Sequence, residues 1–133
     1  MKNAVKNKDE CWIQTNSGIH FNPLNPRLED INIKDIAHAL SNICRFCGHS
    51  KVFYSVAEHS TIVSEFLPTE LKLVGLLHDA SEAYITDIPA PLKPFLSNYE
   101  EIEERLSLKI YERFGIKETF LENRDRIREI DER

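Results

Sequence analysis

A histidine and an aspartate, His78 and Asp79, stand side by side directly after an apolar run that ends at Leu77. Neighbouring residues on a helix point about 100° apart, so both side chains can lean toward one point. Glu82 follows four residues after His78 and three after Asp79, on the same face if the helix continues. An imidazole, a carboxylate and a spare carboxylate on one face suit metal-assisted hydrolysis. The same residues also suit a solvated or capped helix end, and they do not decide between the two alone.

A second histidine, His59, is placed to join them. Residues 55–58 (Ser-Val-Ala-Glu) have the form of a capping box and predict a helix that stops at Pro68. The next helix is expected from residue 70 to about residue 84. Because a short proline-containing turn joins these two helices, they should pack antiparallel and bring His59 toward His78. Taken alone, His59 is more readily explained as a packed core or surface residue.

One more acid from the C-terminal helix would complete a set of two imidazoles and two carboxylates. This set suits a divalent ion such as Mn²⁺, Co²⁺, Zn²⁺, Ni²⁺ or Fe²⁺, with positions left open for water and substrate. An ion held in this way can activate water for hydrolysis.

The elements that must position these residues are helical. The chain has 133 residues, 41% of them hydrophobic, only four glycines, and periodic runs of Leu, Ile, Glu and Lys. We predict an all-α fold of five or six helices in a single domain over residues 1–133, with residues 1–17 as an N-terminal lead-in. The expected helices start at the cap Asn32 and run out at Gly48, then cover residues 55–67, 70–84, 97–114 (opened by a second capping box) and 118–133.

Composition argues against several classes of protein. The formal net charge of −5 disfavours a surface that coats nucleic acid. No stretch approaches ~18 consecutive apolar residues, and the N-terminus lacks the apolar core of a signal peptide. Three cysteines suit a reducing compartment, so we predict a cytoplasmic protein. The pair Cys44 and Cys47 has no second pair with which to bind zinc, and core packing explains Cys44 better.

Several segments resemble the HD-domain metal-dependent phosphohydrolase superfamily, whose signature is H…HD…D on an all-helical fold. Residues 58–60 (Glu-His-Ser), 78–82 (His-Asp-Ala-Ser-Glu) and 87–93 (Asp-Ile-Pro-Ala-Pro-Leu-Lys) are similar to segments of its bacterial 5′-deoxyribonucleotidases. Residues 35–56 are more similar still to phage- and prophage-encoded members. The resemblance covers roughly residue 18 to the end, and it implies an HD-domain helical bundle whose C-terminus is shorter than that of its relatives.

The resemblance also implies a set of metal ligands, namely His59, His78, Asp79 and one late aspartate. In the family this aspartate lies near the start of a late helix, a few residues ahead of a Glu-Arg pair. Asp125 fits that position best, and Asp131 and Glu129 are weaker alternatives. The ion would be one of Mn, Co, Zn, Ni, Fe or Mg.

Further residues receive roles by the same resemblance. Glu82 would act as the general acid or base, and Asp87 would orient water or the sugar 3′-oxygen. Arg45 would bind phosphate, Phe46 would line the sugar side and Lys93 would add positive charge at the rim. For Arg45 a helix-end cation that pairs with exposed carbonyls is an equally good explanation. For Phe46 and Lys93 a purely structural role is the better one.

The function expected is hydrolysis of a phosphate ester of a nucleotide, in particular a deoxynucleotide, as a small-molecule substrate. We expect no membrane and no nucleic-acid polymer as partner, and a homodimer is compatible with this interpretation. One alternative is a degenerate HD module that binds a nucleotide or a partner without turnover. The other is a helical interaction protein whose acids and histidines lie on the surface without a catalytic role.

Overall fold

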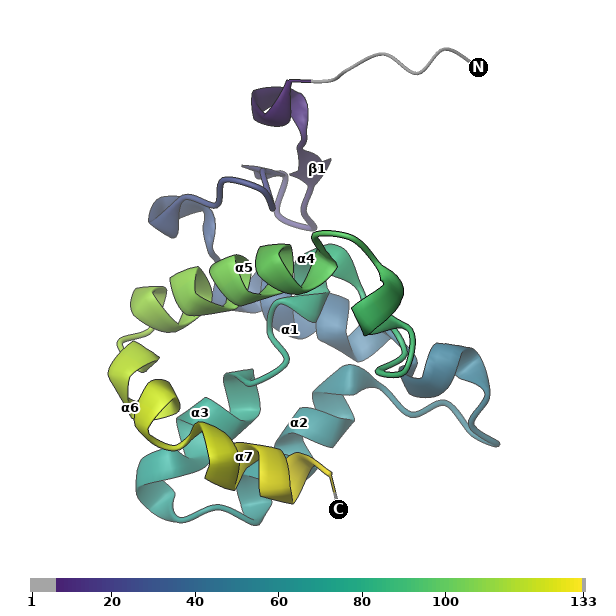
Figure 1. The fold of residues 1–133 in the computed structure, drawn as a ribbon, viewed down its shortest axis with the longest axis vertical. Helices are drawn as coiled ribbons and strands as arrows, with labels where there is room; N and C mark the ends of the chain where they lie inside the picture. The colour runs from purple at the N-terminus through teal and green to yellow at the C-terminus, as the bar shows by residue number, and fades with distance from the viewer. Residues whose placement is uncertain (1–6, 133) are drawn as a thin grey trace.

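The computed structural model describes residues 7–132, whose regular structure is helical apart from one small hairpin (Figure 1). Its α-helices are α1 (Ile33–Asn42), α2 (Val56–Glu65), α3 (Lys72–Leu77), α4 (Glu82–Ile85), α5 (Tyr99–Arg113), α6 (Lys117–Glu122) and α7 (Arg124–Asp131). The predicted all-α class is confirmed. There are more helical segments than expected because two of the predicted helices are each divided in two. The single-domain assignment stays a prediction.

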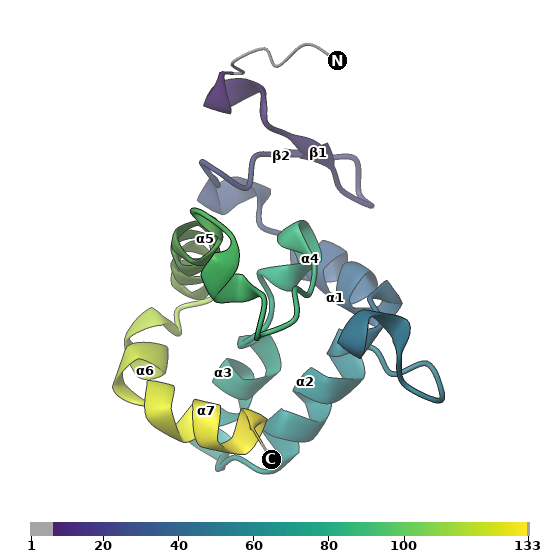
Figure 2. The same ribbon diagram turned by 45° about the vertical axis from the view of Figure 1, so that its right-hand side comes forward.

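The N-terminal hairpin lies at one end of the molecule (Figure 2). It consists of β1 (Ile13–Gln14) and β2 (His20–Phe21), which pair antiparallel. Phe21 is completely buried and stacks on Tyr84 of α4, with 3.8 Å between the ring centroids. The hairpin is therefore attached to the helical core through an aromatic pair. Residues 1–6 of the predicted lead-in lie outside the described residues.

The first helix starts where the sequence predicted and ends earlier. The Asn32 side chain accepts hydrogen bonds from two backbone amides of the first turn, which confirms it as the N-cap. The helix ends at Asn42 rather than near Gly48, because Ile43 is extended and Cys44 forms an antiparallel bridge with Ser55. The chain then makes a short 3₁₀ segment, Arg45–Gly48.

Close packing of α2 against α3 brings the two histidines together. A short 3₁₀ turn, Thr69–Leu71, reverses the chain between them, and both helices bury an apolar face. At Gly75 of α3 an added Cβ would overlap Leu67 Cδ1 and would lie only 3.2 Å from Ser64 Cα. The lack of a side chain at Gly75 therefore allows the two backbones to approach each other.

The helix predicted from residue 70 to residue 84 is interrupted just where the chemistry was expected. Residues 78–81 form turns between α3 and α4, and the amides of Ala80, Glu82 and Ala83 bond to carbonyls three residues back. The Gly75 carbonyl accepts from His78 Nδ1 at 2.6 Å. A side chain thus takes an acceptor that a continuing helix would offer to its own backbone.

The C-terminal part of the structure consists of α5, α6 and α7. In α5, Leu106 and Ile110 are fully buried, as the predicted apolar ladder requires. Asn98 is the N-cap of α5 but makes no side-chain cap, so the second capping box does not form. The predicted last helix divides into α6 and α7, and α7 packs across α2 (Figure 1).

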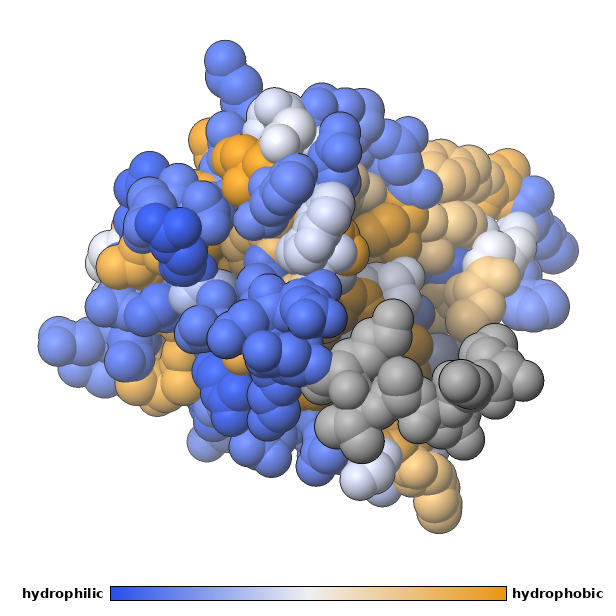
Figure 3. All heavy atoms as spheres, turned by 90° about the horizontal axis from the view of Figure 1, so that it is seen from above, coloured by the Kyte–Doolittle hydropathy of each residue, from blue (hydrophilic) through white to orange (hydrophobic). Residues whose placement is uncertain are grey.

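The surface is mixed in polarity. Seen from above, hydrophilic side chains cover most of the visible face, and hydrophobic ones form smaller patches among them (Figure 3). Among residues 7–132 no helix has both the length and the apolar character needed to cross a bilayer.

The close approach at Gly75 yields a stability prediction. We expect Gly75→Ala to lower the free energy of unfolding by about 1–3 kcal/mol, because the new methyl group must push α2 and α3 apart. Urea denaturation followed by circular dichroism measures the change. Leu76→Ala, at the exposed neighbouring position on α3, is the control and should cost less. A Gly75→Ala protein as stable as the parent would show that the helices can separate freely.

Candidate metal centre

His59 is held by the first turns of α2. The Ser55 side chain accepts a hydrogen bond from the Glu58 amide at 3.0 Å, as the predicted N-cap should. His59 is only 5% exposed and points away from solvent toward α3 and α7. The Tyr54 ring meets it edge-on at a centroid distance of 6.5 Å. The imidazole therefore has little rotational freedom.

His78 and Asp79 lie in the turn that follows α3. The rings of His59 and His78 lie 5.3 Å apart between centroids. Asp79 Oδ2 lies 3.0 Å from His78 Nε2 and 3.5 Å from His59 Nε2. The three residues that the sequence singled out on two different helices therefore meet at one point.

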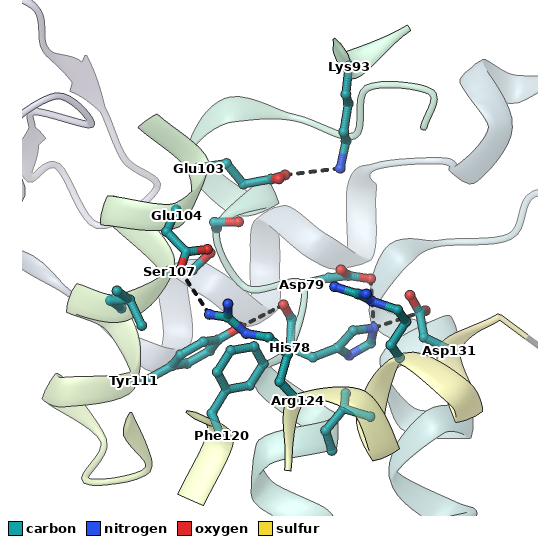
Figure 4. Close-up of a pocket in the computed structure, with 14 residues that line it drawn as sticks. His78, Asp79, Lys93, Glu103, Glu104, Ser107, Tyr111, Phe120, Arg124 and Asp131 are labelled. Atoms are coloured by element: carbon teal, nitrogen blue, oxygen red, sulfur yellow. Dashed lines mark hydrogen bonds and ion pairs between the residues drawn. The ribbon is translucent and has the colours of Figure 1, made fainter. Parts of the chain in front are cut away.

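A second carboxylate, from α7, completes this group (Figure 4). Asp131 Oδ1 lies 2.6 Å from His59 Nε2 and 3.1 Å from His78 Nε2. One possible ligand atom from each of the four residues lies within 4.8 Å of the others. Among the described residues no other group of three or more His, Cys, Asp or Glu side chains converges in this way.

Asp131 takes the place that we predicted for Asp125, and this part of the ligand prediction needs correction. Ile127 is buried and fixes which side of α7 faces the core. Asp131 follows it by four residues and so shares that face, whereas Asp125 precedes it by two, about 200° round the helix. Asp125 is exposed and lies outside the group, as does Glu129. Helical spacing from Ile127 was the signal that could have identified Asp131.

The four residues compensate one another's charge. Burial disfavours charge on His78, but the Asp79 and Asp131 carboxylates outweigh it and raise the pKa of His78 well above its usual value. Burial also opposes ionisation of both aspartates, yet the imidazoles prevail and lower the pKa of Asp79 and of Asp131. The two carboxylates are therefore ionised, and they attract positive charge to the centre of the group.

Glu82 lies beside this group in the opposite state of ionisation. It is 6% exposed, at the start of α4. Burial, followed by the Asp79 and Asp87 carboxylates, raises the pKa of Glu82 to about 10. Burial and Asp79 also raise the pKa of Asp87. Glu82 thus carries a proton at neutral pH, next to the Asp79 carboxylate, which does not.

The remaining predicted residues line one cavity with the group. This cavity, of about 310 Å³, is bordered by Arg45, Phe46, Glu82, Asp87 and Lys93 together with Asp79 and Asp131. Their roles stay predictions, but the structure brings all of them to the same opening. Two further cavities, of about 240 Å³ and about 410 Å³, also reach Asp131.

The cations of this cavity are already engaged. Arg45 Nη1 lies 3.0 Å from His59 Nδ1, and its guanidinium lies over the rings of Phe46 and Tyr54. Lys93 Nζ bonds Glu103 Oε2 at 3.1 Å (Figure 4). Arg45 follows the end of α1 by three residues, so its alternative explanation as a cation capping that helix does not describe these contacts.

Tyr111 supports the site although the sequence gave no functional sign of it. Its hydroxyl donates to the His78 carbonyl at 2.8 Å (Figure 4). That carbonyl lies in the turn where the helix is interrupted, so α5 supplies a partner for it. Tyr111 follows Ile110 in the buried ladder and looks like an ordinary core residue in the sequence.

The donor set fits a divalent cation. Two imidazole nitrogens and two carboxylate oxygens converge, and the two ionised carboxylates would balance the charge of the ion. His78 has the partner expected of a ligating histidine, because its other ring nitrogen bonds a backbone carbonyl. The structure thus defines a helical protein with a partly buried site able to bind a metal ion.

Comparison with known proteins finds similar sequences, but the names of these proteins state no activity. No protein-family model matches the chain. It is similar to the uncharacterized protein YfdR of Escherichia coli (strain K12), with 49% identity over 105 residues, which covers 79% of this chain and 59% of that protein. It is also similar to the uncharacterized protein RCAP_rcc00048 of Rhodobacter capsulatus, with 36% identity over 116 residues, covering 80% and 59%. The chain thus matches 59% of the length of each of these relatives.

The two late aspartates give a matched pair of variants. We expect Asp131→Asn to weaken Mn²⁺ binding by at least about 100-fold, because loss even of a supporting partner costs about 10–100-fold. Asp125→Asn removes the same charge from the exposed side of α7 and should bind Mn²⁺ as the parent does. Isothermal titration calorimetry measures both affinities. Equal losses in the two variants would contradict the placement of Asp131.

The raised pKa of His78 predicts competition between protons and metal. Below that pKa a cation must displace a proton, so Mn²⁺ affinity should rise by up to about tenfold per pH unit from pH 6 through neutrality. In the metal-free protein, the stability of the fold changes with pH in the opposite direction to the metal affinity. Charged His78 stabilises the fold below about pH 6.5, and this stabilisation is lost as the pH rises through the folded pKa.

Titration calorimetry at pH 6, 7 and 8, in buffers of different ionisation enthalpy, measures both the affinity and the protons released. His38→Gln, at an exposed position of α1, is the control and should leave the pH dependence unchanged. Affinity that stays constant from pH 6 to pH 8 would show that His78 carries no proton to displace.

Proposed function

We propose that this chain is a metal-dependent phosphohydrolase of the HD-domain type that cleaves a phosphate ester of a nucleotide, in particular a deoxynucleotide. The convergence of His59, His78, Asp79 and Asp131 carries the proposal. The order His, His-Asp, Asp along the chain is the signature of that superfamily. Mn²⁺, Co²⁺, Zn²⁺, Ni²⁺, Fe²⁺ and Mg²⁺ are the candidate ions.

A divalent cation at these residues would supply the electrophile that polarises the phosphate and activates water. The chain itself must bind the phosphate and manage protons. Arg45 and Lys93 are the cations of the 310 Å³ cavity and can pair with phosphate oxygens. Phe46 lies at the rim of this cavity, where its exposed ring can contact the sugar.

We infer that Glu82 transfers the proton. Its carboxyl group holds a proton at neutral pH and borders the same cavity as Arg45 and Asp87. Part of its raised pKa comes from the Asp79 carboxylate, so neutralising Asp79 brings the pKa of Glu82 down toward the range of an efficient acid or base. We assign to Glu82 the protonation of the leaving oxygen, and to Asp87 the orientation of water or the sugar 3′-oxygen.

A phosphate-release screen tests this function. Mono-, di- and triphosphates of ribo- and deoxynucleosides are incubated with the protein and Mn²⁺, Co²⁺, Zn²⁺ or Mg²⁺. Release from deoxynucleotides in the presence of a divalent ion supports the proposal. Binding of metal and nucleotide without release would point instead to a binding module, and absence of metal binding would point to a helical interaction protein.

Replacement of Glu82 separates chemistry from metal binding. We expect Glu82→Gln to lower turnover by about 10²–10⁴-fold while Mn²⁺ remains bound, because the amide cannot transfer a proton. Steady-state kinetics and calorimetry measure the two effects.

Glu103→Gln is the matched control. The Glu103 carboxylate pairs with Lys93 beside the site but does not belong to the group of four possible metal ligands. This variant should keep most of the turnover. Full activity in Glu82→Gln would remove Glu82 from its assigned role.

A further inference from the structure

The contact between Arg45 and His59 determines which ring nitrogen of His59 carries a proton. A guanidinium has only donors and stays charged in proteins, so His59 Nδ1, 3.0 Å from Arg45 Nη1, must accept. The neutral ring then bears its proton on Nε2. The distance of 2.6 Å from Nε2 to Asp131 Oδ1 fits a donated hydrogen bond from that proton to the carboxylate.

His78 has the opposite arrangement. Its Nδ1 lies 2.6 Å from the Gly75 carbonyl, which can only accept, so Nδ1 carries a proton. Once His78 is neutral, its Nε2 presents a lone pair to Asp79 and Asp131. A ligating histidine needs such a lone pair, together with an acceptor for its other nitrogen. His78 has this acceptor, whereas His59 has a donor in its place.

We propose that Arg45 holds His59 in the tautomer that cannot bind a metal ion, so that metal binding requires the Arg45–His59 hydrogen bond to break. This inference rests on the metal site of the proposed function. When the ion binds, Nε2 gives its proton to water and Nδ1 takes one from water, with no net change in charge. Nδ1–H and the guanidinium are then both donors, and Arg45 must leave.

The 310 Å³ cavity offers Arg45 a new position. Arg45 and Asp87 border the same 310 Å³ cavity, and their charges already interact, because Arg45 opposes the rise in the pKa of Asp87. A movement of the Arg45 side chain toward Asp87 would exchange the His59 nitrogen for a carboxylate or for an anionic ligand in this cavity. Metal binding would thus release Arg45, and Arg45 becomes a positioning residue for the metal site as well as a cation for substrate.

Nitrogen-15 NMR of histidine-labelled, metal-free protein tests the tautomer directly, with His59→Gln to assign the signal. The parent protein and Arg45→Lys, which keeps a donor, should show His59 protonated on Nε2. Arg45→Met, which has no donor, should shift His59 toward Nδ1 protonation. A parent protein already protonated on Nδ1 would overturn the proposal, as would a spectrum unchanged in Arg45→Met.

Mn²⁺ affinity supplies a second readout. We expect Arg45→Met to bind Mn²⁺ about tenfold more tightly, which corresponds to about 1.4 kcal/mol, and Arg45→Lys to bind close to the parent value. Removing a nearby positive charge also favours a cation, so Lys93→Met serves as the matched control. Lys93 interacts with the charge of Asp79 but has no hydrogen bond to His59 among the described contacts. The gain in Arg45→Met should exceed that in Lys93→Met.

The two proposals fail in different ways. Equal gains in Arg45→Met and Lys93→Met, or no gain in either, with Mn²⁺ bound normally by the parent protein, would overturn the role of Arg45 and leave the metal site intact. Absence of Mn²⁺ binding in the parent and in every variant would overturn the metal site and this inference together.

Discussion

Two ionised carboxylates, Asp79 and Asp131, lie close together in a partly buried place, and their mutual repulsion must be offset by positive charge. Charged His78 supplies this compensation in the structure, with its Nε2 3.0 Å from Asp79 and 3.1 Å from Asp131, and His59 Nε2 contacts the same two carboxylates. A divalent cation would meet the same need more strongly. The first turns of α2, the turn after α3, and α7 each contribute to this group.

The break in the helix between α3 and α4 contains two residues of this group. In the turn at residues 78–81, His78 and Asp79 point at one centre and the His78 carbonyl accepts from Tyr111. It also allows α4 to place Glu82 on the inner side, where burial keeps its carboxyl group protonated. Two acids three residues apart thus acquire opposite states of ionisation.

The environments of the two imidazoles differ although both face the same carboxylates. A backbone carbonyl supports His78, and a guanidinium faces His59. Hydrogen-bond partners outside the immediate group decide what each ring can do, because they determine where its proton resides. The 310 Å³ cavity is therefore connected with the metal site through the contact of Arg45 with His59.

The sequence by itself determined the helical class, the caps Asn32 and Ser55, and the meeting of His59 with His78 and Asp79. These depend on local signals: periodic apolar residues, capping side chains, and a short turn that forces neighbouring helices to pack antiparallel. The observed helices confirm the class, hydrogen bonds confirm the two caps, and the distances at the site confirm the meeting of the three residues.

The tertiary structure decided between Asp125 and Asp131, because it shows that Ile127 is buried; helical spacing points to Asp131 only once Ile127 is known to mark the side of α7 that packs inward. The tertiary structure alone located the break after α3 and the early end of α1, where a side-chain bond and a bridge to a distant residue replace helical bonds. The contact of Arg45 with His59 joins two segments separated by fourteen residues. Contacts of this kind depend on how helices pack, and residue spacing along the chain does not encode them directly.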